Sequence, residues 1–578
     1  MAQTDTALPR PSPLSPAARL LWTALILATL YLCYFHNLGA LGLVGPDEPR
    51  YAWIARNMAE TGDWVTPRLY GQPWFEKPVL YYWGAALSFK LFGVSETAAR
   101  LPSAICALLA TLALAWLALR TWGAETARWL LLLLPTTVGM IGFSHAAATD
   151  MPFAAMLTIA MVFAAILLRI VPHELASSFT FSTSLTSFFL GFFLGLATLA
   201  KGPAALILSG GAVLLWAALT KRWRDAFRCL HPVAILSFSA TALPWYVLCA
   251  RRNPDFLRVF IIEHNFKRFL TPEFQHIQPF WFYLPIILLA LFPWTLLFLA
   301  DAIPRANQFW KERSSQLSPF AAFLCSWPLF CLLFFTASKS KLPGYILPAV
   351  APLALLLAEI GRRGLRKAPA ALRWPLFATG LALVLLGVAL RQVAPKLPAL
   401  SCASPVCGVT RIWIIGVCGG LVMATLAAAG KLRAGLVAAV LAVLLLVVET
   451  DRFLPSLDPG VSARGAVRVA QTVWPDFQAR RAASWDLKRS YSYQLSYYAH
   501  REIAEWRPGG SAPMWLFVPR GKQSEAANLG FRCVSFAVAP AVIPCRADES
   551  MSALRGSLGG WSRGGSGTGS TGSVLSDR

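Results

Sequence analysis

Long apolar runs alternate with short polar connections over most of the chain, from Leu20 to Glu449. Each run is about 20 residues long, the length of helix that crosses a hydrocarbon layer roughly 30 Å thick. Such runs must be helical, because lipid offers backbone amides no hydrogen-bond partner. The pattern predicts thirteen membrane-spanning helices, at 20–43, 98–119, 129–146, 151–169, 186–200, 203–220, 231–250, 280–300, 318–337, 344–360, 374–392, 410–429 and 434–450.

The polar segments around these runs predict the domain organisation. The first run has no small-residue cleavage site after a short core, so we interpret it as a retained anchor rather than a signal peptide. Short strand-like runs such as "MWLFVP" and a helix-like run, "VRVAQTVWPDFQARRAA", predict a small α/β domain near the C-terminus. The predicted sections are a cytoplasmic tail at 1–19, a membrane domain at 20–450 with a long first loop at 44–97, an outer domain at 451–548, and a disordered Gly/Ser-rich tail at 549–578.

The overall composition agrees with a polytopic α-helical membrane protein. Of the 578 residues, 56% are hydrophobic and 14% are charged, and the mean hydropathy is +0.54. A soluble core of this length could not hide so much apolar material from water.

The basic residues of the short loops predict the orientation. Six loops assigned to the inside hold 17 Lys and Arg, whereas four short outside loops hold 5. Cytoplasmic loops carry such an excess, so the N-terminus is predicted in the cytoplasm and, after an odd number of spans, the outer domain in the periplasm. The same bias accounts for much of the formal net charge of +24. It therefore argues against a nucleic-acid partner.

Most of the eleven cysteines lie in predicted helices, where a small apolar role is expected. Two pairs differ, because both fall on the predicted oxidising side of the membrane. We therefore expect disulfides between Cys402 and Cys407 and between Cys533 and Cys545.

Unusual polar residues gather in the loops placed outside the membrane. An ionisable residue near the depth of a membrane helix is costly and by default suggests function. The first loop also contains an amphipathic stretch, "YAWIARNMAETGDW", that suits a helix lying along the membrane surface. The outer polar residues are Asp47, Glu48, Arg50, Glu76 and Lys77 in the first loop and Asp150, Lys201, His264, Arg268, Lys341 and Tyr345 in later loops.

Each of these residues also has a structural explanation. Asp150 could cap the helix that starts at "TDMP", and Lys201 could extend its ammonium group to the interface. His264 could be a hydrogen-bonded surface residue, and Asp47 and Glu48 could belong to a solvated loop.

Carboxylates beside several cations at an outer membrane face suit transfer of a sugar from a polyprenyl phosphate. The lipid tail of such a donor requires the bilayer, and its leaving phosphate needs cations to stabilise the developing charge. The acids would orient the acceptor or activate its hydroxyl, and the catalytic candidates are Asp47, Glu48 and Asp150. The candidate phosphate-binding groups are Arg50, Lys77, Lys201, Arg268, Lys341 and the Tyr345 hydroxyl.

Seven segments carry a resemblance to a known family: "PDEPRYAWIARNM", "GDWVTPRLYGQPWFEKPVLYYW", "SFKLFGVSETAARLPS", "TDMPFAAM", "LAKGP", "EHNFKRF" and "SKSKLPGYILP". Over about residues 20 to 360 the chain resembles the bacterial aminoarabinose lipid A transferases, within the protein O-mannosyltransferase-like group of C-type glycosyltransferases (GT-C). The resemblance implies the GT-C fold, with thirteen spans and a periplasmic C-terminal domain. It also implies transfer from a polyprenyl phosphate, usually undecaprenyl phosphate, at the outer face of the bacterial inner membrane.

The resemblance further implies roles for individual residues. Asp47 matches an acid viewed as catalytic or acceptor-positioning, with Glu48 next to it, and Asp150 matches a second acid near the site. Glu76 and His264 match residues able to hold a divalent metal (Zn, Mg or Mn). Donor-phosphate contacts are matched by Lys77, Arg268 and Tyr345.

The sugar and the acceptor stay open at this point. No motif aligns after about residue 360, so 4-amino-4-deoxy-L-arabinose and lipid A are one pairing, and transfer to protein or glycan hydroxyls is another. In either case we expect inverting transfer by single displacement. A flippase for a lipid-linked sugar is an alternative, but it predicts polar groups at both faces and related halves. The charge here is one-sided, and no repeat is visible. An inactive scaffold is disfavoured because both first-loop acids are present.

Overall fold

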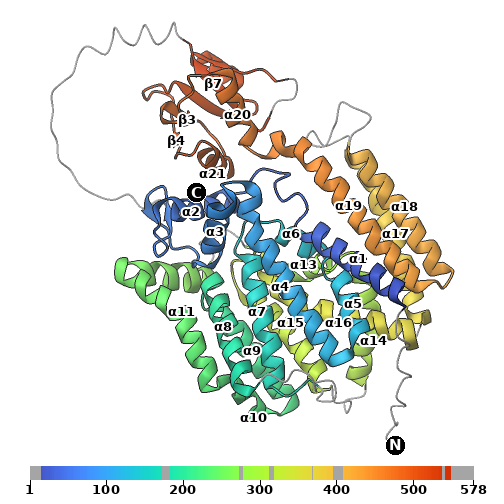
Figure 1. Cartoon of the computed structure of the whole chain (residues 1–578). Coiled ribbons are helices and arrows are strands. Elements are labelled where there is room, and N and C mark those ends of the chain that lie inside the picture. Colours follow the sequence, from blue (N-terminus) through green and yellow to red (C-terminus); the bar gives the residue numbers. More distant parts are fainter. Residues whose placement is uncertain are drawn as a thin grey trace, which may run out of the picture.

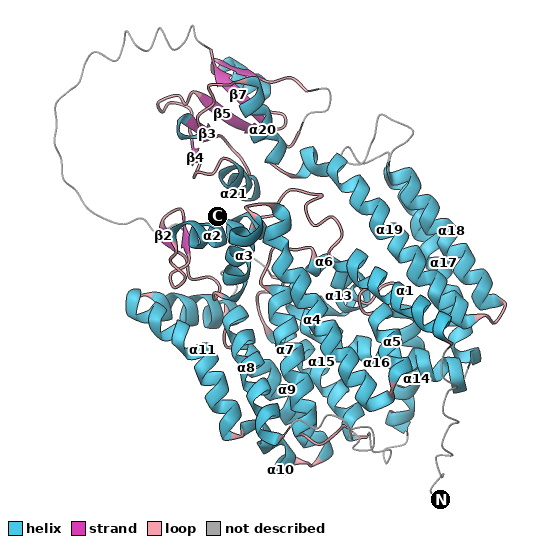
Figure 2. Cartoon of the chain, in the orientation of Figure 1, coloured by secondary structure: helices cyan, strands magenta, loops and turns pink. Residues whose placement is uncertain are grey.

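A membrane-type helical domain and a small mixed sheet make up the computed structural model (Figure 1, Figure 2). It describes residues 15–171, 182–271, 277–311, 318–367, 369–394, 408–536 and 540–548. The predicted Cys402–Cys407 disulfide, the tail at 549–578 and residues 1–14 lie outside the described residues.

Helices form nearly all of the chain up to residue 461. They are α1 (Pro16–Tyr34), α2 (Asp47–Thr61), α3 (Leu80–Phe92), α4 (Glu96–Trp122), α5 (Ala124–Leu133), α6 (Val138–Ser144), α7 (Asp150–Leu167), α8 (Thr183–Lys201), α9 (Ala204–Thr220), α10 (Trp223–Ala226), α11 (Pro232–Arg252), α12 (Arg268–Leu270), α13 (Tyr283–Ala290), α14 (Thr295–Lys311), α15 (Pro319–Ala337), α16 (Leu347–Lys367), α17 (Pro369–Val393), α18 (Gly408–Ala428) and α19 (Leu432–Val461). Short 3-10 and π helices include Pro343–Ile346 and Arg258–Lys267.

Every predicted span corresponds to helix, but the count of thirteen spans is not confirmed. Among the described residues, ten helices are long and apolar enough to cross a membrane, or eleven if α5 and α6, bent by 63°, form one span. Helix α9 has only 17 residues, and the run at 280–300 is divided between α13 and α14. Pro135 and Pro293 lie at the two breaks, and proline interrupts a helix without lowering the hydrophobicity of a run.

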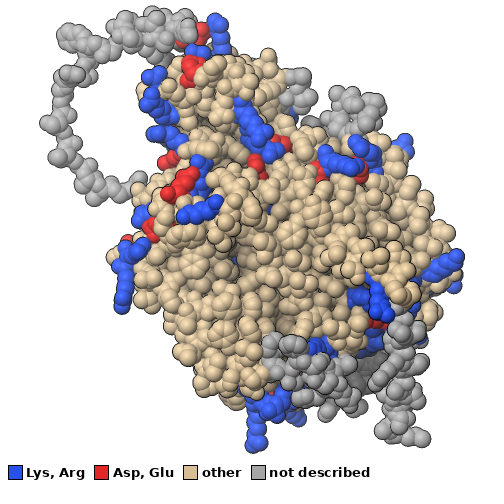
Figure 3. Space-filling view, viewed as in Figure 1, with Lys and Arg blue, Asp and Glu red and all other residues tan. Residues whose placement is uncertain are grey.

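The surface of the helical domain has the charge distribution of a membrane protein. Figure 3 shows a broad belt with few charged side chains between two charged ends. Helices α7 and α16 are largely buried, whereas α1 and α18 turn most of their residues outward. The structure is therefore a multi-pass bundle with α7 and α16 at its centre.

The C-terminal region confirms the predicted α/β domain. Its five-stranded sheet has the order β4-β3-β5-β7-β6, with β3 parallel to β4 and β5 and with β7 antiparallel to β5 and β6. The predicted disulfide between Cys533 and Cys545 joins β6 to β7. The elements are α20 (Arg464–Val473), β3 (Ala482–Ser484), α21 (Arg489–Tyr498), β4 (Ala504–Glu505), β5 (Trp515–Pro519), α22 (Gln523–Asn528), β6 (Phe531–Cys533) and β7 (Val542–Ala547). Because α19 extends to Val461, the outer domain begins about ten residues later than the predicted 451.

The outer domain is attached to the start of the first loop. The Leu43 amide donates to the hydroxyl of Tyr498 in the outer domain at 2.7 Å, and the Gly42 amide donates to Oδ1 of Asp458, near the end of α19, at 2.7 Å. Arg464 forms ion pairs with both Asp458 and Glu96. A Cβ at residue 42 would lie 2.3 Å from Ser462 Oγ, so only glycine allows this approach. The outer domain therefore lies directly over α2 and α3 (Figure 1).

Candidate active site

Helix α2 positions the two acids of the first loop. It begins at Asp47 and carries both Asp47 and Glu48 in its first turn, where the helix dipole favours negative charge. A two-stranded hairpin of β1 (Arg68–Leu69) and β2 (Gln72–Pro73) then leads to Glu76 and Lys77. The predicted amphipathic segment is thus a helix, and its neighbouring acids have very different surroundings.

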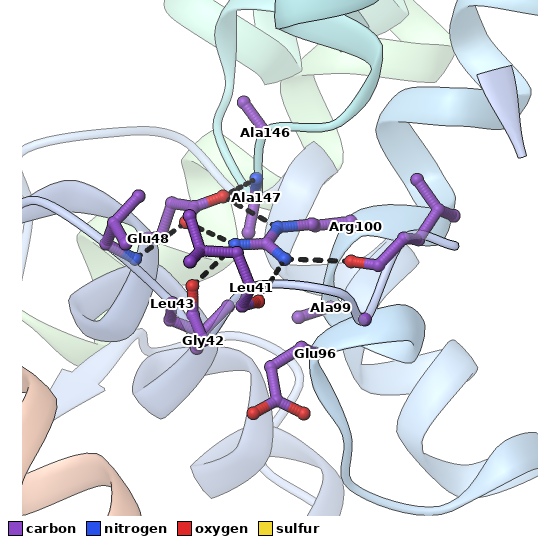
Figure 4. Close-up of polar contacts among 12 residues, drawn as sticks. Leu41, Gly42, Leu43, Glu48, Glu96, Ala99, Arg100, Ala146 and Ala147 are labelled. Carbon is purple, nitrogen blue, oxygen red and sulfur yellow. Dashed lines mark hydrogen bonds and ion pairs between the residues drawn. The ribbon is translucent and has the colours of Figure 1, made fainter. Parts of the chain in front are cut away.

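Glu48 is enclosed in a buried ion pair with Arg100 of α4 (Figure 4). Arg100 Nε donates to Glu48 Oε1 at 3.0 Å, and Arg100 Nη2 donates to Oε2 at 2.8 Å. The backbone amides of Val44 and Ala147 also donate to this carboxylate. The remaining Arg100 donors bind the carbonyls of Leu38, Leu41 and Gly42. Glu48 thus joins three separate segments of the chain and is already saturated with hydrogen bonds.

Asp47 points to a different set of partners. Arg50 Nη2 donates to Asp47 Oδ1 at 2.6 Å and lies 2.9 Å from Glu76 Oε2, so one guanidinium bridges the two carboxylates. The Asp47 side chain is 48% exposed, compared with 10% for Glu76. Loss of water around Asp47 raises its pKa, and Arg50 opposes that rise. Nearly half of the Asp47 side chain is exposed, so this carboxyl group is open to a further partner.

Glu76 is the centre of the cationic part of the site. Its Oε1 lies 3.4 Å from Arg268 Nη1 and 3.8 Å from Lys77 Nζ. Burial alone would raise the pKa of Glu76, but the charges of Arg50, Lys77 and Arg268 lower it well below its usual value. Burial, with a contribution from Arg268, lowers the pKa of Lys77 to about 8. Lys77 is therefore an ammonium group that a bound anion would stabilise further.

Asp150 and Lys201 form a second ion pair beside this group. Lys201 Nζ lies 2.5 Å from Asp150 Oδ1 and 4.5 Å from the centre of the Tyr345 ring. A Cβ at Gly344 would lie 2.6 Å from Asp150 Oδ1, so glycine lets the segment before Tyr345 approach the acid. Asp150 is the first residue of α7, but its carboxylate binds Lys201.

The ion pairs and the electrostatic neighbours together define one cluster. The charge of Asp150 raises the pKa of Asp47, and the charge of Lys201 lowers the pKa of Lys77. Tyr345 interacts electrostatically with Arg268. We call these residues the acid–base cluster: Asp47, Arg50, Glu76, Lys77, Asp150, Lys201, Arg268 and Tyr345. They come from five separate segments, as the sequence analysis expected.

Lys341 is placed differently from the other predicted phosphate-binding residues. Its Nζ donates to the Ser338 carbonyl at 2.6 Å, and the side chain is buried. Within the described part of the chain no ion pair joins Lys341 to the acid–base cluster.

The predicted metal ligands do not fit a divalent ion. His264 lies close enough to Glu76 to lower the pKa of its carboxyl group. Three cations, Arg50, Lys77 and Arg268, already surround that carboxylate. The described residues contain no group of three or more His, Cys, Asp or Glu side chains that could hold a metal. A metal at Glu76 would have to displace these cations, which already neutralise the carboxylate.

Two residues near the cluster could not be selected from the sequence. In the sequence, Arg100 is one more basic residue near the start of an apolar run. The structure shows that its side chain is buried, with 4% exposure, and an ionisable residue buried in an apolar helix has a functional or structural role.

Tyr493, on α21 of the outer domain, has its ring 5.6 Å from the Arg50 guanidinium carbon. Trp74 and Tyr51 lie over the same guanidinium at 5.4 and 5.2 Å. Three aromatic rings therefore hold Arg50 in place.

The cluster has the charges needed to receive a phosphate. Four cations, Arg50, Lys77, Lys201 and Arg268, surround three carboxylates. A phosphate between Lys77 and Arg268 would balance the surplus positive charge and would form charge-assisted hydrogen bonds. Asp47 is the most exposed of the three acids, and it is the one able to face a second substrate.

Comparison with known proteins first defines the class. The crystal structure of ArnT from Cupriavidus metallidurans, bound to undecaprenyl phosphate, superposes with a TM-score of 0.70 over 92% of this chain and 98% of ArnT, at 21% identity. The apo form of the same protein superposes with a TM-score of 0.69. The chain therefore shares the GT-C fold of a multi-pass membrane protein.

A family model and curated relatives each match part of the chain. The model of the dolichyl-phosphate-mannose-protein mannosyltransferase (PMT) family matches residues 20–260. The undecaprenyl phosphate-alpha-4-amino-4-deoxy-L-arabinose arabinosyl transferase of Edwardsiella ictaluri is 36% identical over 339 residues, 58% of this chain and 59% of that protein. The corresponding transferase of Photorhabdus laumondii is 34% identical over 317 residues, 55% of each chain. The chain thus aligns with less than two thirds of the length of these relatives.

Proposed function

We propose that this protein transfers 4-amino-4-deoxy-L-arabinose, or a related sugar, from undecaprenyl phosphate to lipid A. The acid–base cluster carries the proposal, because it combines a surplus of cations for the donor phosphate with one exposed acid. The relatives that are about one third identical are named as transferases of this sugar. The proposed location is the periplasmic face of the bacterial inner membrane, with the outer domain in the periplasm.

In the proposed mechanism the acceptor oxygen attacks the anomeric carbon as the lipid phosphate leaves. The new bond forms on the face opposite the leaving group, so the anomeric configuration inverts. Lys77, Arg268 and Arg50 stabilise the charge that develops on the departing phosphate. Lys201, which pairs with Asp150 and lies over the Tyr345 ring, adds a further positive charge to the cluster.

The role of Asp47 depends on the acceptor. A phosphate of lipid A is already ionised, so Asp47 need not remove a proton from it. Asp47 then positions the acceptor or stabilises positive charge on the sugar ring. If a protein or glycan hydroxyl were the acceptor, Asp47 would act as the general base.

Glu48 has a positioning role in this proposal rather than a direct one. Its two oxygens already accept from Arg100 and from two backbone amides. It fixes the first turn of α2, and thereby the direction of Asp47, without touching substrate.

The test is to incubate the purified full-length protein, in liposomes containing lipid A, with a labelled undecaprenyl-phosphate sugar. The expected result is free undecaprenyl phosphate together with labelled lipid A. Movement of intact labelled donor across the bilayer, without cleavage, would instead identify a flippase. Release of sugar only when a peptide or glycan is supplied would reject lipid A as the acceptor.

A further inference from the structure

A second polar site lies at the end of the helical domain opposite the outer domain. Helix α4 begins at Glu96, which is ion-paired with Arg464 of the outer domain, and ends at Trp122. Trp122 lines a pocket of about 550 Å³. A helix of this length extends roughly 40 Å, so the pocket is separated from the acid–base cluster by the thickness of a membrane.

The pocket lies where α4, α14, α16 and α17 meet, and three arginines line it. Arg305 comes from α14, and Arg362 and Arg363 come from α16, together with the acids Asp301 and Glu359. Arginines at this end of the molecule are expected from the excess of basic residues in cytoplasmic loops. Their convergence on one pocket goes beyond that expectation.

The ion pairs within the pocket leave two arginines able to bind a ligand. Arg362 donates to both oxygens of Glu359, at 2.6 and 2.8 Å, and so neutralises this buried acid. Glu359 engages only the Nε group of Arg363, whose side chain is 44% exposed. Arg305 is paired with Asp301 and is 56% exposed. Arg363 and Arg305 can therefore add a phosphate oxygen to their contacts.

The apolar surface beside the pocket indicates the source of the phosphate. Leu296 and Ile303 of α14 are 37% and 54% exposed, and Trp374 of α17 is 67% exposed. Leu296 is next in sequence to the pocket-lining Leu297, and Ile303 and Trp374 are each two residues from a lining residue. Helix α17 is long and apolar enough to cross a membrane. A ligand with a phosphate group and acyl chains would contact both surfaces, whereas a soluble phosphate would contact only the arginines.

We propose that this pocket binds the headgroup of an anionic phospholipid. The phosphodiester would lie between Arg305 and Arg363, the glycerol portion would lie against Trp122, and the acyl chains would follow α14 and α17. Basic pockets between membrane helices on the cytoplasmic side are a common form of lipid headgroup site. The inference concerns a site separate from sugar transfer, and it holds or fails independently of the proposed activity.

Native mass spectrometry of the purified full-length protein tests this proposal. Phosphatidylglycerol and phosphatidylethanolamine are titrated separately, and the dissociation constant of the first bound lipid is compared. Wild type should bind phosphatidylglycerol about tenfold or more tightly than phosphatidylethanolamine, because the ammonium group of the second lipid cancels the charge of the same phosphodiester and is repelled by the arginines. The double variant Arg305→Gln/Arg363→Gln should lose that preference. The single variant Arg363→Gln, which removes only one exposed arginine, should show an intermediate loss and serves if the double variant does not fold.

A matched control uses two ion-paired arginines outside the pocket. Arg222 and Arg228 both pair with Asp225 beside α10, at the same end of the molecule (Figure 1). The variant Arg222→Gln/Arg228→Gln should keep the wild-type preference. An unchanged preference in the pocket variants would overturn the proposal. Displacement of phosphatidylglycerol by an equal concentration of soluble glycerol phosphate would also overturn it, because the site would then recognise a free phosphate.

Discussion

The adjacent acids Asp47 and Glu48 belong to two regions that both contain carboxylates paired with cations, but the two regions differ in charge balance and in exposure. Around Glu48, one carboxylate meets one arginine, both are buried, and every oxygen has donors. Around Asp47, four cations share three carboxylates, and Asp47 itself is 48% exposed. The balanced pair holds the chain in place, whereas the unbalanced cluster can gain stability from a bound anion. An excess of positive charge and an exposed acid therefore distinguish the acid–base cluster from the Glu48–Arg100 pair. The presence of acids does not distinguish them, because both contain carboxylates.

The largest expected effect is on transfer by Asp47→Asn. This change keeps the size of the side chain but removes the charge that faces the acceptor. Transfer should fall by about 10²–10⁴-fold, the range of a positioned acid or base. Donor affinity should stay near that of wild type. Turnover of the labelled donor measures the effect, with Glu60→Gln on the same helix as control because Glu60 is exposed and pairs with Arg56. Normal turnover by Asp47→Asn would remove this acid from the mechanism.

The next largest effect should be on stability, from Arg100→Met. The substitution leaves Glu48 buried without its ion-pair partner and removes the donors to three carbonyls. Breaking a buried pair in this way costs about 3–5 kcal/mol. The thermal unfolding midpoint of the purified protein reports the loss. Arg258→Met, in an exposed pair, should cost about 1 kcal/mol or less. Equal midpoints for the two variants would mean that the Glu48–Arg100 pair does not support the fold.

Donor affinity should respond to Lys77→Ala and to Arg268→Ala. Each removes one cation that would contact the phosphate, and a hydrogen bond to a charged group contributes about 1.5–3 kcal/mol. The dissociation constant for undecaprenyl phosphate should therefore rise by roughly 10–100-fold. Lys339→Ala, an exposed lysine in a neighbouring loop, is the control. If both cluster variants bind donor as tightly as Lys339→Ala, the phosphate lies elsewhere.

The pKa of Lys77, lowered to about 8, predicts a pH dependence of donor binding. Below pH 8 the ammonium group is charged and can bind the phosphate. As the pH rises through 8 the proton is lost, so affinity should fall by up to about tenfold per pH unit. Lys77→Arg keeps a charge over this range and should flatten the profile. A wild-type affinity that is constant from pH 7 to pH 10 would contradict this assignment.

The smallest expected effect comes from the outer domain. Tyr493→Leu removes one of three rings over Arg50, and such a contact is worth about 0.5–1 kcal/mol. Transfer should fall by about two- to fivefold, with no change in the affinity for donor. Tyr493→Phe keeps the ring and should behave like wild type. Wild-type transfer by Tyr493→Leu would show that this contact from the outer domain does not contribute to the reaction.

Sequence periodicity predicted the helices well but not their interruptions. Apolar runs mark where chain can be buried in lipid, and each predicted run is helical. Pro135 and Pro293 break two of those runs, and a helix of 17 residues follows Lys201. Hydropathy averages over such breaks, so thirteen predicted runs stand against ten or eleven helices of spanning length among the described residues.

The sequence predicted the candidate site from the charged residues and from the side of the membrane on which their loops lie. It did not predict which of these residues pair with one another. Loops assigned to one face can be expected to meet, and Asp47, Glu76, Asp150 and Lys201 do so. The sequence does not reveal which of two adjacent acids is saturated, because the partner of Glu48 is 52 residues away. Nor does it place Tyr493, more than 400 residues along the chain, over Arg50.

An experimental structure of the full-length protein with undecaprenyl phosphate bound would locate the donor phosphate relative to the acid–base cluster. Phosphate oxygens should lie within about 3 Å of Lys77 Nζ and of the Arg268 guanidinium, the usual length of a charge-assisted hydrogen bond. Asp47 should lie beside the phosphate on its open side. A phosphate bound away from both cations, with the acid–base cluster unchanged, would contradict this prediction.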